Sequence, residues 1–194
     1  DYVFDGTKDT SYVETDTPHP LTVYGQSKLE GERWVAEYLQ NYIIMRIAWV
    51  YGAQGKNFVK TMLKLGKDQI EKRKQISEIA ALKVVNDQFG NPTWTMDIVK
   101  QTGWLLDSDI RGIVHSTSEG VTTWYELARA IFEEADMDVA VAPCHTSEFP
   151  RPAPRPHFSA LENRRLKKAG LNIMPEWRES LRKFFVQNGE IMKL

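Results

Sequence analysis

The spacing of apolar and polar residues predicts that helices and strands alternate along the chain. Apolar residues recur at helical intervals from about Tyr24 to Leu39, which predicts a helix there. The run YIIMRIAWVYG, residues 42–52, is almost continuously β-branched or aromatic, as in a strand buried on both faces. The same pattern predicts helices over 57–67, 95–106 and 122–135, and strands over 81–86 and 112–117. This alternation is typical of an α/β fold with a parallel sheet at the front, followed by a smaller and more mixed lobe.

The two ends of the chain are less regular. DYVFDG, residues 1–6, reads as the end of a buried strand, Tyr2–Phe4, that runs into an Asp-Gly turn. Because domains rarely begin in mid-strand, we expect the chain to be the carboxy-terminal part of a longer protein. Residues 143–156 are rich in proline and are expected to be irregular, and short helices are expected within 160–170 and 175–185.

Composition and charge narrow the function classes. The 194 residues are 42% hydrophobic and carry a net charge of −1, so no basic surface points to nucleic acid or to an anionic membrane. No apolar run approaches the roughly 18 residues of a membrane span. The lone Cys144 excludes an internal disulfide and fits a reducing compartment. A cytoplasmic protein is the expectation.

A tyrosine and a lysine lie one helical turn apart at the start of the first predicted helix. Tyr24 and Lys28 are separated by four positions, which puts both on one helix face. A phenol and an ammonium in that arrangement can act on one substrate. The alternative is a packed tyrosine ring beside a lysine whose ammonium reaches into solvent.

Eight segments in the same order resemble the extended short-chain dehydrogenase/reductase family, in its dTDP-4-dehydrorhamnose reductase branch. They are DYVFDG, YGQSKLEGE, RIAWVYG, GKNFVKTML, VVNDQFGNPTW, GIVHSTSEGVTTWYELA, RPAPRPHFSAL and MPEWRESL. The resemblance implies that residues 1–52 end a doubly wound, Rossmann-like NAD(P)-binding domain whose amino-terminal part is missing. It implies that residues 53–194 form mostly a mixed α/β substrate-binding lobe, with about 95–118 returning to the Rossmann-like domain. No G-x-G-x-x-G cofactor motif occurs in the chain.

The resemblance also implies a reaction, the reduction by NADPH or NADH of the 4-keto group of dTDP-4-dehydro-6-deoxy-L-mannose. Hydride transfer leaves negative charge on the carbonyl oxygen, so a proton donor is needed beside it. Tyr24 is expected to be that donor, and Lys28 to favour its phenolate and to bind the nicotinamide ribose. The family's third catalytic residue, Ser or Thr, would directly precede Asp1.

The substrate side is expected to involve Trp49, Asn57, Lys60 and Arg155. By resemblance Trp49 packs against the deoxysugar, although a core role is the alternative. Asn57 and Lys60 open a helix and are expected near nucleotide or phosphate groups, with helix capping by Asn57 as the close alternative. Arg155, with Arg151, lies in a proline-stiffened loop and suits a diphosphate, unless that loop is a solvated connector.

Several expectations stay open at the level of sequence. Gln88 and Gly90 are expected to shape the floor of the substrate lobe or merely to form a Gly-Asn-Pro turn. The four histidines lack metal-ligand spacing, so no metal ligands are assigned. Family members sometimes dimerise through Mg²⁺ held by carboxylates, and Glu179 and Glu190 leave Mg²⁺ and a homodimer open. Alternative functions are a non-catalytic binding or regulatory subunit, or a nucleotide-sugar epimerase or dehydratase.

Overall fold

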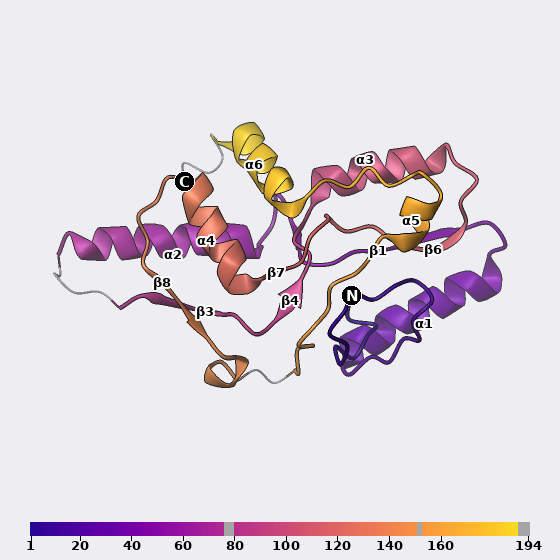
Figure 1. The fold of residues 1–194 in the computed structure, drawn as a ribbon, viewed down its shortest axis with the longest axis horizontal. Helices are drawn as coiled ribbons and strands as arrows, with labels where there is room; N and C mark the ends of the chain where they lie inside the picture. The colour runs from indigo at the N-terminus through magenta and orange to yellow at the C-terminus, as the bar shows by residue number, and fades with distance from the viewer. Residues whose placement is uncertain (76–79, 151–152, 190–194) are drawn as a thin grey trace.

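The computed structural model describes residues 1–75, 80–150 and 153–189. Its helices are α1 (Val23–Tyr38), α2 (Phe58–Arg73), α3 (Thr95–Leu106), α4 (Trp124–Glu134), α5 (Arg164–Lys168) and α6 (Trp177–Asn188), with a 3-10 turn at Thr146–Glu148. Its strands are β1 (Ile43–Arg46), β2 (Val50–Tyr51), β3 (Leu82–Val85), β4 (Phe89–Gly90), β5 (Thr93–Trp94), β6 (Gly112–His115), β7 (Thr122–Thr123) and β8 (Val141–Cys144). Figure 1 shows α1 and α3 at the opposite end of the molecule from α2.

The strands pair across long stretches of sequence. Parallel pairs join β1 to β6, β2 to β5 and β3 to β8, and one antiparallel pair joins β4 to β7. Parallel strands need a crossover connection, and helices or long loops supply it here. The predicted α/β fold with parallel strands is therefore confirmed.

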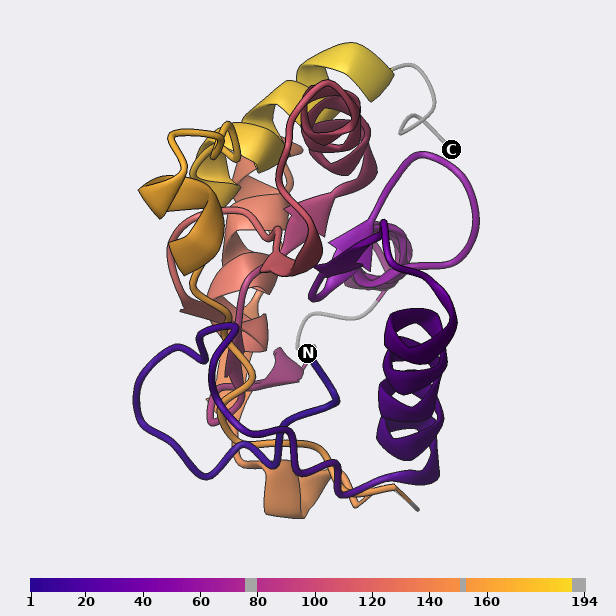
Figure 2. The same ribbon diagram turned by 90° about the vertical axis from the view of Figure 1, so that its right-hand side faces the viewer.

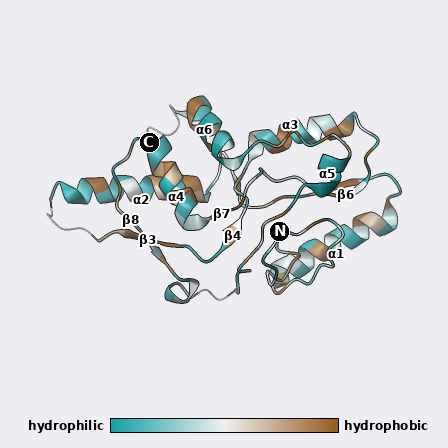
Figure 3. Ribbon diagram, in the orientation of Figure 1, coloured by the Kyte–Doolittle hydropathy of each residue, from teal (hydrophilic) through white to brown (hydrophobic). Residues whose placement is uncertain are grey.

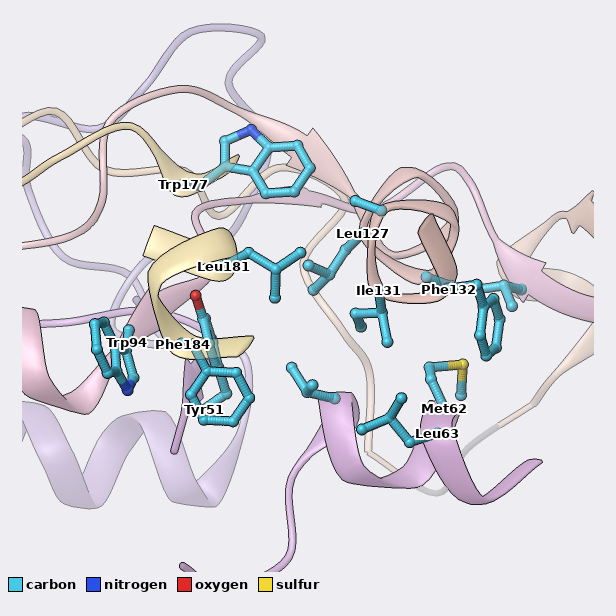
Figure 4. Packing of buried hydrophobic residues seen from close by; sticks show 14 residues of the cluster. Tyr51, Met62, Leu63, Trp94, Leu127, Ile131, Phe132, Trp177, Leu181 and Phe184 are labelled. Carbon is cyan, nitrogen blue, oxygen red and sulfur yellow. The ribbon is translucent and has the colours of Figure 1, made fainter. Parts of the chain in front are cut away.

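The largest apolar core lies among three helices and the strands beside them. Helix α4 packs against α2, α6, β3 and β8. Figure 4 shows Ile131 and Phe132 of α4 directed toward Met62 and Leu63 of α2. Apolar and polar positions share the surfaces of α2 and α4 in Figure 3, as expected for helices that cover a core with one face. This core holds the starts of α2 and α4 next to each other.

A second, smaller core anchors α1 to the amino-terminal segment. Val3, Phe4, Tyr12 and Leu161 are buried together, and Leu29 of α1 packs against them. Figure 2 shows the loop of residues 1–20 beside α1. Gly25 permits this contact, because a Cβ atom there would lie 2.2 Å from the Tyr2 carbonyl oxygen. The first turn of α1 is thereby held close to residues 1–4.

Three expectations about elements differ from the structure. Residues 1–6 form turns and bends, so the expected strand at Tyr2–Phe4 is wrong. Val3 and Phe4 are buried against Tyr12 and Leu161 instead, and Tyr2 is only partly buried. The expected strand over 42–52 is interrupted at residues 47–49, and β1 is half-buried rather than buried on both faces. Part of the segment expected to be irregular, 143–156, belongs to β8, where Pro143 pairs with Val84.

Candidate active site

A cavity of about 350 Å³ opens where six segments meet that are far apart in sequence, one of them the amino-terminal segment with Asp1 and Tyr2. Its lining includes Tyr24 from α1, Trp49 from the break between β1 and β2, and Gln88 from the β3–β4 connection. Trp124, at the start of α4, and Arg155, from the loop before α5, complete this set. The structure thus brings together Tyr24, Trp49 and Arg155, which the sequence predicts as site residues.

Tyr24 lies in the first turn of α1 because the helix begins directly before it. Thr22 is the N-cap, and its hydroxyl accepts a hydrogen bond of 3.0 Å from the Gly25 backbone amide. The Tyr24 ring meets the Tyr2 ring edge-on, at 5.7 Å between centroids, and the residue remains 59% exposed. A helix start at this point leaves the phenol at the pocket, where a substrate can reach it.

Lys28 follows Tyr24 by one turn, as the sequence predicts. Its ammonium nitrogen lies 5.4 Å from the centroid of the Tyr24 ring, which places a positive charge beside the phenol. Within residues 1–75, 80–150 and 153–189, the Lys28 ammonium has no acidic partner within ion-pair distance. The pair therefore keeps its hydrogen-bonding capacity for another molecule.

Trp49 turns into the pocket by an unusual backbone conformation. Its φ angle is +44°, in the left-handed region that costs a residue with a side chain roughly 1–2 kcal/mol. The Trp49 ring stacks on Trp124 with 3.6 Å between centroids and 7° between planes. Trp49 lies in the break between β1 and β2, directly before Val50, and its side chain lines the cavity.

The polar run Asn86–Gln88, directly after β3, ties the walls of the pocket together. Gln88 accepts a hydrogen bond of 3.2 Å from the Trp124 indole N–H and donates one of 3.0 Å to the Thr146 hydroxyl. Asn86 accepts a hydrogen bond from the Thr123 hydroxyl at 2.7 Å. Sequence reasoning assigns Gln88 only a general role at the floor of the lobe, and it misses the partner Trp124.

Asp87, the middle residue of this run, binds the 3-10 turn at Thr146–Glu148. Its carboxylate accepts hydrogen bonds from both the backbone amide and the hydroxyl of Thr146. Partial burial raises the pKa of Asp87, but the hydrogen bonds from Thr146 outweigh it and leave the pKa below its usual value. The ionised carboxylate thus holds the 3-10 turn against the β3–β4 connection. A signal for this network is visible in sequence, since three polar residues follow a buried strand.

Asn57 and Lys60 serve the start of α2 and are not among the residues that line the pocket. The Asn57 side chain caps α2 by accepting from the Lys60 amide at 3.1 Å, and it donates to the Gly52 carbonyl at 2.8 Å. The Lys60 ammonium donates to the Ala53 carbonyl at 3.1 Å. These bonds close the loop between β2 and α2, as the capping alternative expects. The expected contact with substrate stays a prediction.

The remaining site candidates are the arginines of the proline-rich loop and the groups that could hold a metal ion. Arg155 is exposed at the rim of the pocket, whereas Arg151 and Glu190 lie outside the described residues. In the described part of the chain, no group of three or more His, Cys, Asp or Glu side chains is arranged to hold a metal ion. None of the helices described is both long and apolar enough to span a membrane.

Comparisons with known proteins agree with this geometry. The dTDP-4-dehydrorhamnose reductase of Burkholderia thailandensis is 40% identical over 92% of this chain and 62% of its own length. A crystal structure of a dTDP-4-dehydrorhamnose reductase from Clostridium acetobutylicum superposes with a TM-score of 0.89 at 41% identity, covering 97% of this chain and 63% of that one. The Bacillus anthracis reductase, solved in complex with NADP, gives 0.85 at 38% identity, over 96% and 62% of the two chains.

These matches confirm the resemblance expected from the eight sequence segments. The chain spans about three fifths of the length of the curated relatives it matches. The family model described as the RmlD substrate binding domain matches residues 1–189, which is nearly the whole chain. The chain belongs to the RmlD substrate-binding domain family.

Proposed function

We propose that this chain supplies the substrate pocket and the Tyr24–Lys28 pair of a reductase that converts dTDP-4-dehydro-6-deoxy-L-mannose to dTDP-L-rhamnose. The observation that carries the proposal is the meeting of Tyr24, Trp49 and Arg155 in one pocket, with the Lys28 ammonium 5.4 Å from the Tyr24 ring centroid. Relatives named for this activity, at 35–40% identity, support it.

Tyr24 acts as the proton donor in this proposal. Reduction of a ketone turns the carbonyl oxygen into an alkoxide, and the Tyr24 hydroxyl donates its proton to that oxygen. Lys28 places a positive charge beside the resulting phenolate and so stabilises it. NADPH or NADH supplies the hydride when bound, and the NADP complex of the Bacillus anthracis relative favours NADPH. The Lys28 ammonium, which has no acidic partner among the described residues, fits a contact with the cofactor ribose.

The substrate groups are assigned by the chemistry of the pocket walls. Trp49 offers an apolar aromatic surface, which suits the carbon face of a deoxysugar. Arg155 offers a guanidinium at the rim, which suits the diphosphate. Asn57 and Lys60 are proposed to contact the nucleotide side, as the resemblance implies. A cytoplasmic location, a homodimer and a role for Mg²⁺ stay predictions.

The Tyr24→Phe variant tests the proposed chemistry in the protein that carries this chain. Loss of the phenolic hydroxyl is expected to lower kcat on the order of 100-fold or more, the usual effect of removing a positioned general acid. The ring and its contact with Tyr2 are kept, so the melting temperature is expected to stay unchanged. Turnover close to that of the wild type would rule out Tyr24 as the proton donor.

Lys28→Met separates the two roles given to the ammonium. This variant is expected to weaken NADPH binding as well as kcat, because it removes both the charge beside Tyr24 and the proposed ribose contact. Lys64→Met, which changes an exposed lysine of α2 outside the pocket lining, is the matched control. A Lys28→Met enzyme with reduced kcat and normal NADPH affinity would remove the ribose contact from the proposal.

A further inference from the structure

Trp49 cannot hold its position in the pocket by local preference alone. Its left-handed φ of +44° is disfavoured for a bulky residue, so surrounding contacts must determine it. Strained residues of this kind persist where neighbouring structure fixes them, and they gather at ligand sites. The contacts around Trp49 therefore indicate which residues control the shape of the pocket.

Trp124 provides the main contact. The two indoles lie 3.6 Å apart between centroids and nearly parallel, so one face of Trp49 rests on Trp124. Phe58, at the start of α2, meets Trp124 at 4.6 Å between centroids, and Gln88 accepts the Trp124 N–H bond. The Trp124 ring is thus fixed by a ring contact from α2 and by a hydrogen bond from the β3–β4 connection.

Gly90 provides the space that Trp49 needs. A Cβ atom at position 90 would lie 2.3 Å from Cε2 of Trp49 and 2.6 Å from its Cζ2 and Nε1 atoms. These atoms belong to a rigid ring system, so an alanine here would push the indole out of its place. The φ angle of Gly90 is not positive, so glycine is needed here because it has no side chain and not because of its backbone conformation.

We propose that Trp124, Gln88 and Gly90 are positioning residues that hold the Trp49 indole as a fixed wall for the sugar. Trp124 supplies the stacking surface, Gln88 orients Trp124, and Gly90 leaves room for the indole edge. The inference rests on the proposed function in one respect only, that Trp49 faces the sugar of a nucleotide-linked substrate. It assigns control of sugar recognition to residues on two other segments, residues 88–90 and the start of α4.

Gly90→Ala tests this in the protein that carries this chain, because it displaces Trp49 without removing any aromatic ring. Two readouts are measured: the exciton circular-dichroism couplet of the stacked indoles, and the Kd values for dTDP-L-rhamnose and for dTDP. The couplet is expected to weaken and the Kd for dTDP-L-rhamnose to rise about tenfold. The Kd for dTDP, which has no sugar for the wall to contact, is expected to stay within about twofold.

Gly103→Ala is the matched control. Gly103 lies in α3, and a Cβ atom added there would meet no atom of a neighbouring described residue within 4 Å. This glycine-to-alanine change is therefore expected to leave the pocket and its affinities unchanged. A Gly90→Ala protein with an intact couplet would overturn the proposal, and so would a lost couplet with wild-type affinity for dTDP-L-rhamnose.

If Gly90→Ala does not fold, the Trp124→Phe variant tests whether the contacts of Trp49 control sugar binding. Phenylalanine keeps a ring beside Phe58 but loses part of the stacking surface and the N–H bond to Gln88. An increase of about threefold or more in the Kd for dTDP-L-rhamnose is expected, again without a matching loss for dTDP. Unchanged sugar affinity overturns this proposal alone. A wild-type protein that fails to bind dTDP-L-rhamnose overturns the proposed function and this inference with it.

Discussion

Arg46, the last residue of β1, shows how a single side chain secures α1. Its guanidinium forms two hydrogen bonds with the Glu32 carboxylate of α1, at 2.8 and 2.6 Å, and lies 5.1 Å from the Phe4 ring centroid. Its Nη1 atom is 3.5 Å from Nε2 of His115. Burial and the Arg46 charge lower the pKa of His115 to about 3, so the imidazole stays neutral beside the cation.

The Glu32→Gln variant tests how much this ion pair stabilises the protein. The Arg46 and Glu32 side chains are only 5% and 11% exposed, and the variant would leave a buried guanidinium without its counter-charge. We expect the free energy of unfolding to fall by about 3 kcal/mol, the lower part of the range for breaking a buried ion pair. Urea denaturation of the protein that carries this chain measures the change.

Glu30→Gln, on the same helix, is the control for this change. The Glu30–Arg33 pair is 3.6 Å long and its side chains are 53% and 68% exposed, so the expected loss is less than about 0.5 kcal/mol. Equal losses in the two variants would show that the buried pair does not anchor α1 to β1.

At the scale of elements, α2 depends on its first residues. Asn57 caps the helix and also binds the Gly52 carbonyl, so Asn57→Ala removes two hydrogen bonds at once. We expect a loss of about 1 kcal/mol in the free energy of unfolding, typical of a removed N-cap. Asn57→Asp, which keeps the cap acceptor, is expected to lose less. An Asn57→Ala protein as stable as the wild type would contradict the capping role.

The sequence predicted where the helices lie because their signal is local, although α2, expected over 57–67, continues to Arg73. The helix expected from about Tyr24 to Leu39 is α1, Val23–Tyr38, within one residue at each end. Features that depend on distant partners were missed. Strand β8 contains Pro143, which lacks a backbone N–H and reads as a loop residue until its pairing with β3 is known. The left-handed Trp49, in the break between β1 and β2, stacks on Trp124, which lies on another element.

At the scale of the whole molecule, the pocket is a product of the fold rather than of any one segment. Tyr24, Trp49 and Arg155 were predicted as site residues because each lies in a recognisable motif, and the fold brings them together. Trp124 also lies in one of the matching segments, GIVHSTSEGVTTWYELA, but nothing in that segment marked it as a site residue. Its role follows only from the juxtaposition of α4 with the β1–β2 break.

Arg155 lines the pocket from a loop that is distant in sequence from Tyr24 and Trp49, and Arg155→Gln tests its role. Removal of the guanidinium is expected to raise the Kd for dTDP about tenfold, the effect of losing a charge-assisted bond to the diphosphate. The difference from wild type is expected to shrink at high salt, because the contact is exposed. Titration of dTDP at two salt concentrations measures both effects.

Arg178→Gln serves as the control, because Arg178 pairs with Glu133 on an exposed surface and does not line the pocket. Its affinity for dTDP is expected to match that of the wild type. If Arg155→Gln binds dTDP as tightly as the wild type at both salt concentrations, the guanidinium does not contact the diphosphate.

The long-range strand pairing bears on how the chain reaches its native state. Ile43 pairs with Gly112, Leu82 with Val141 and Val50 with Thr93, so the three parallel pairs close loops between residues 69, 59 and 43 positions apart. The entropy of closing such loops is lost before the strands gain their contacts, which slows folding relative to helical proteins of the same length. Helices α2 and α3 lie inside these loops and can form early, shortening the chain that remains to be closed. Until then the apolar strands stay open to pairing with other molecules, so refolding yield is expected to fall as protein concentration rises.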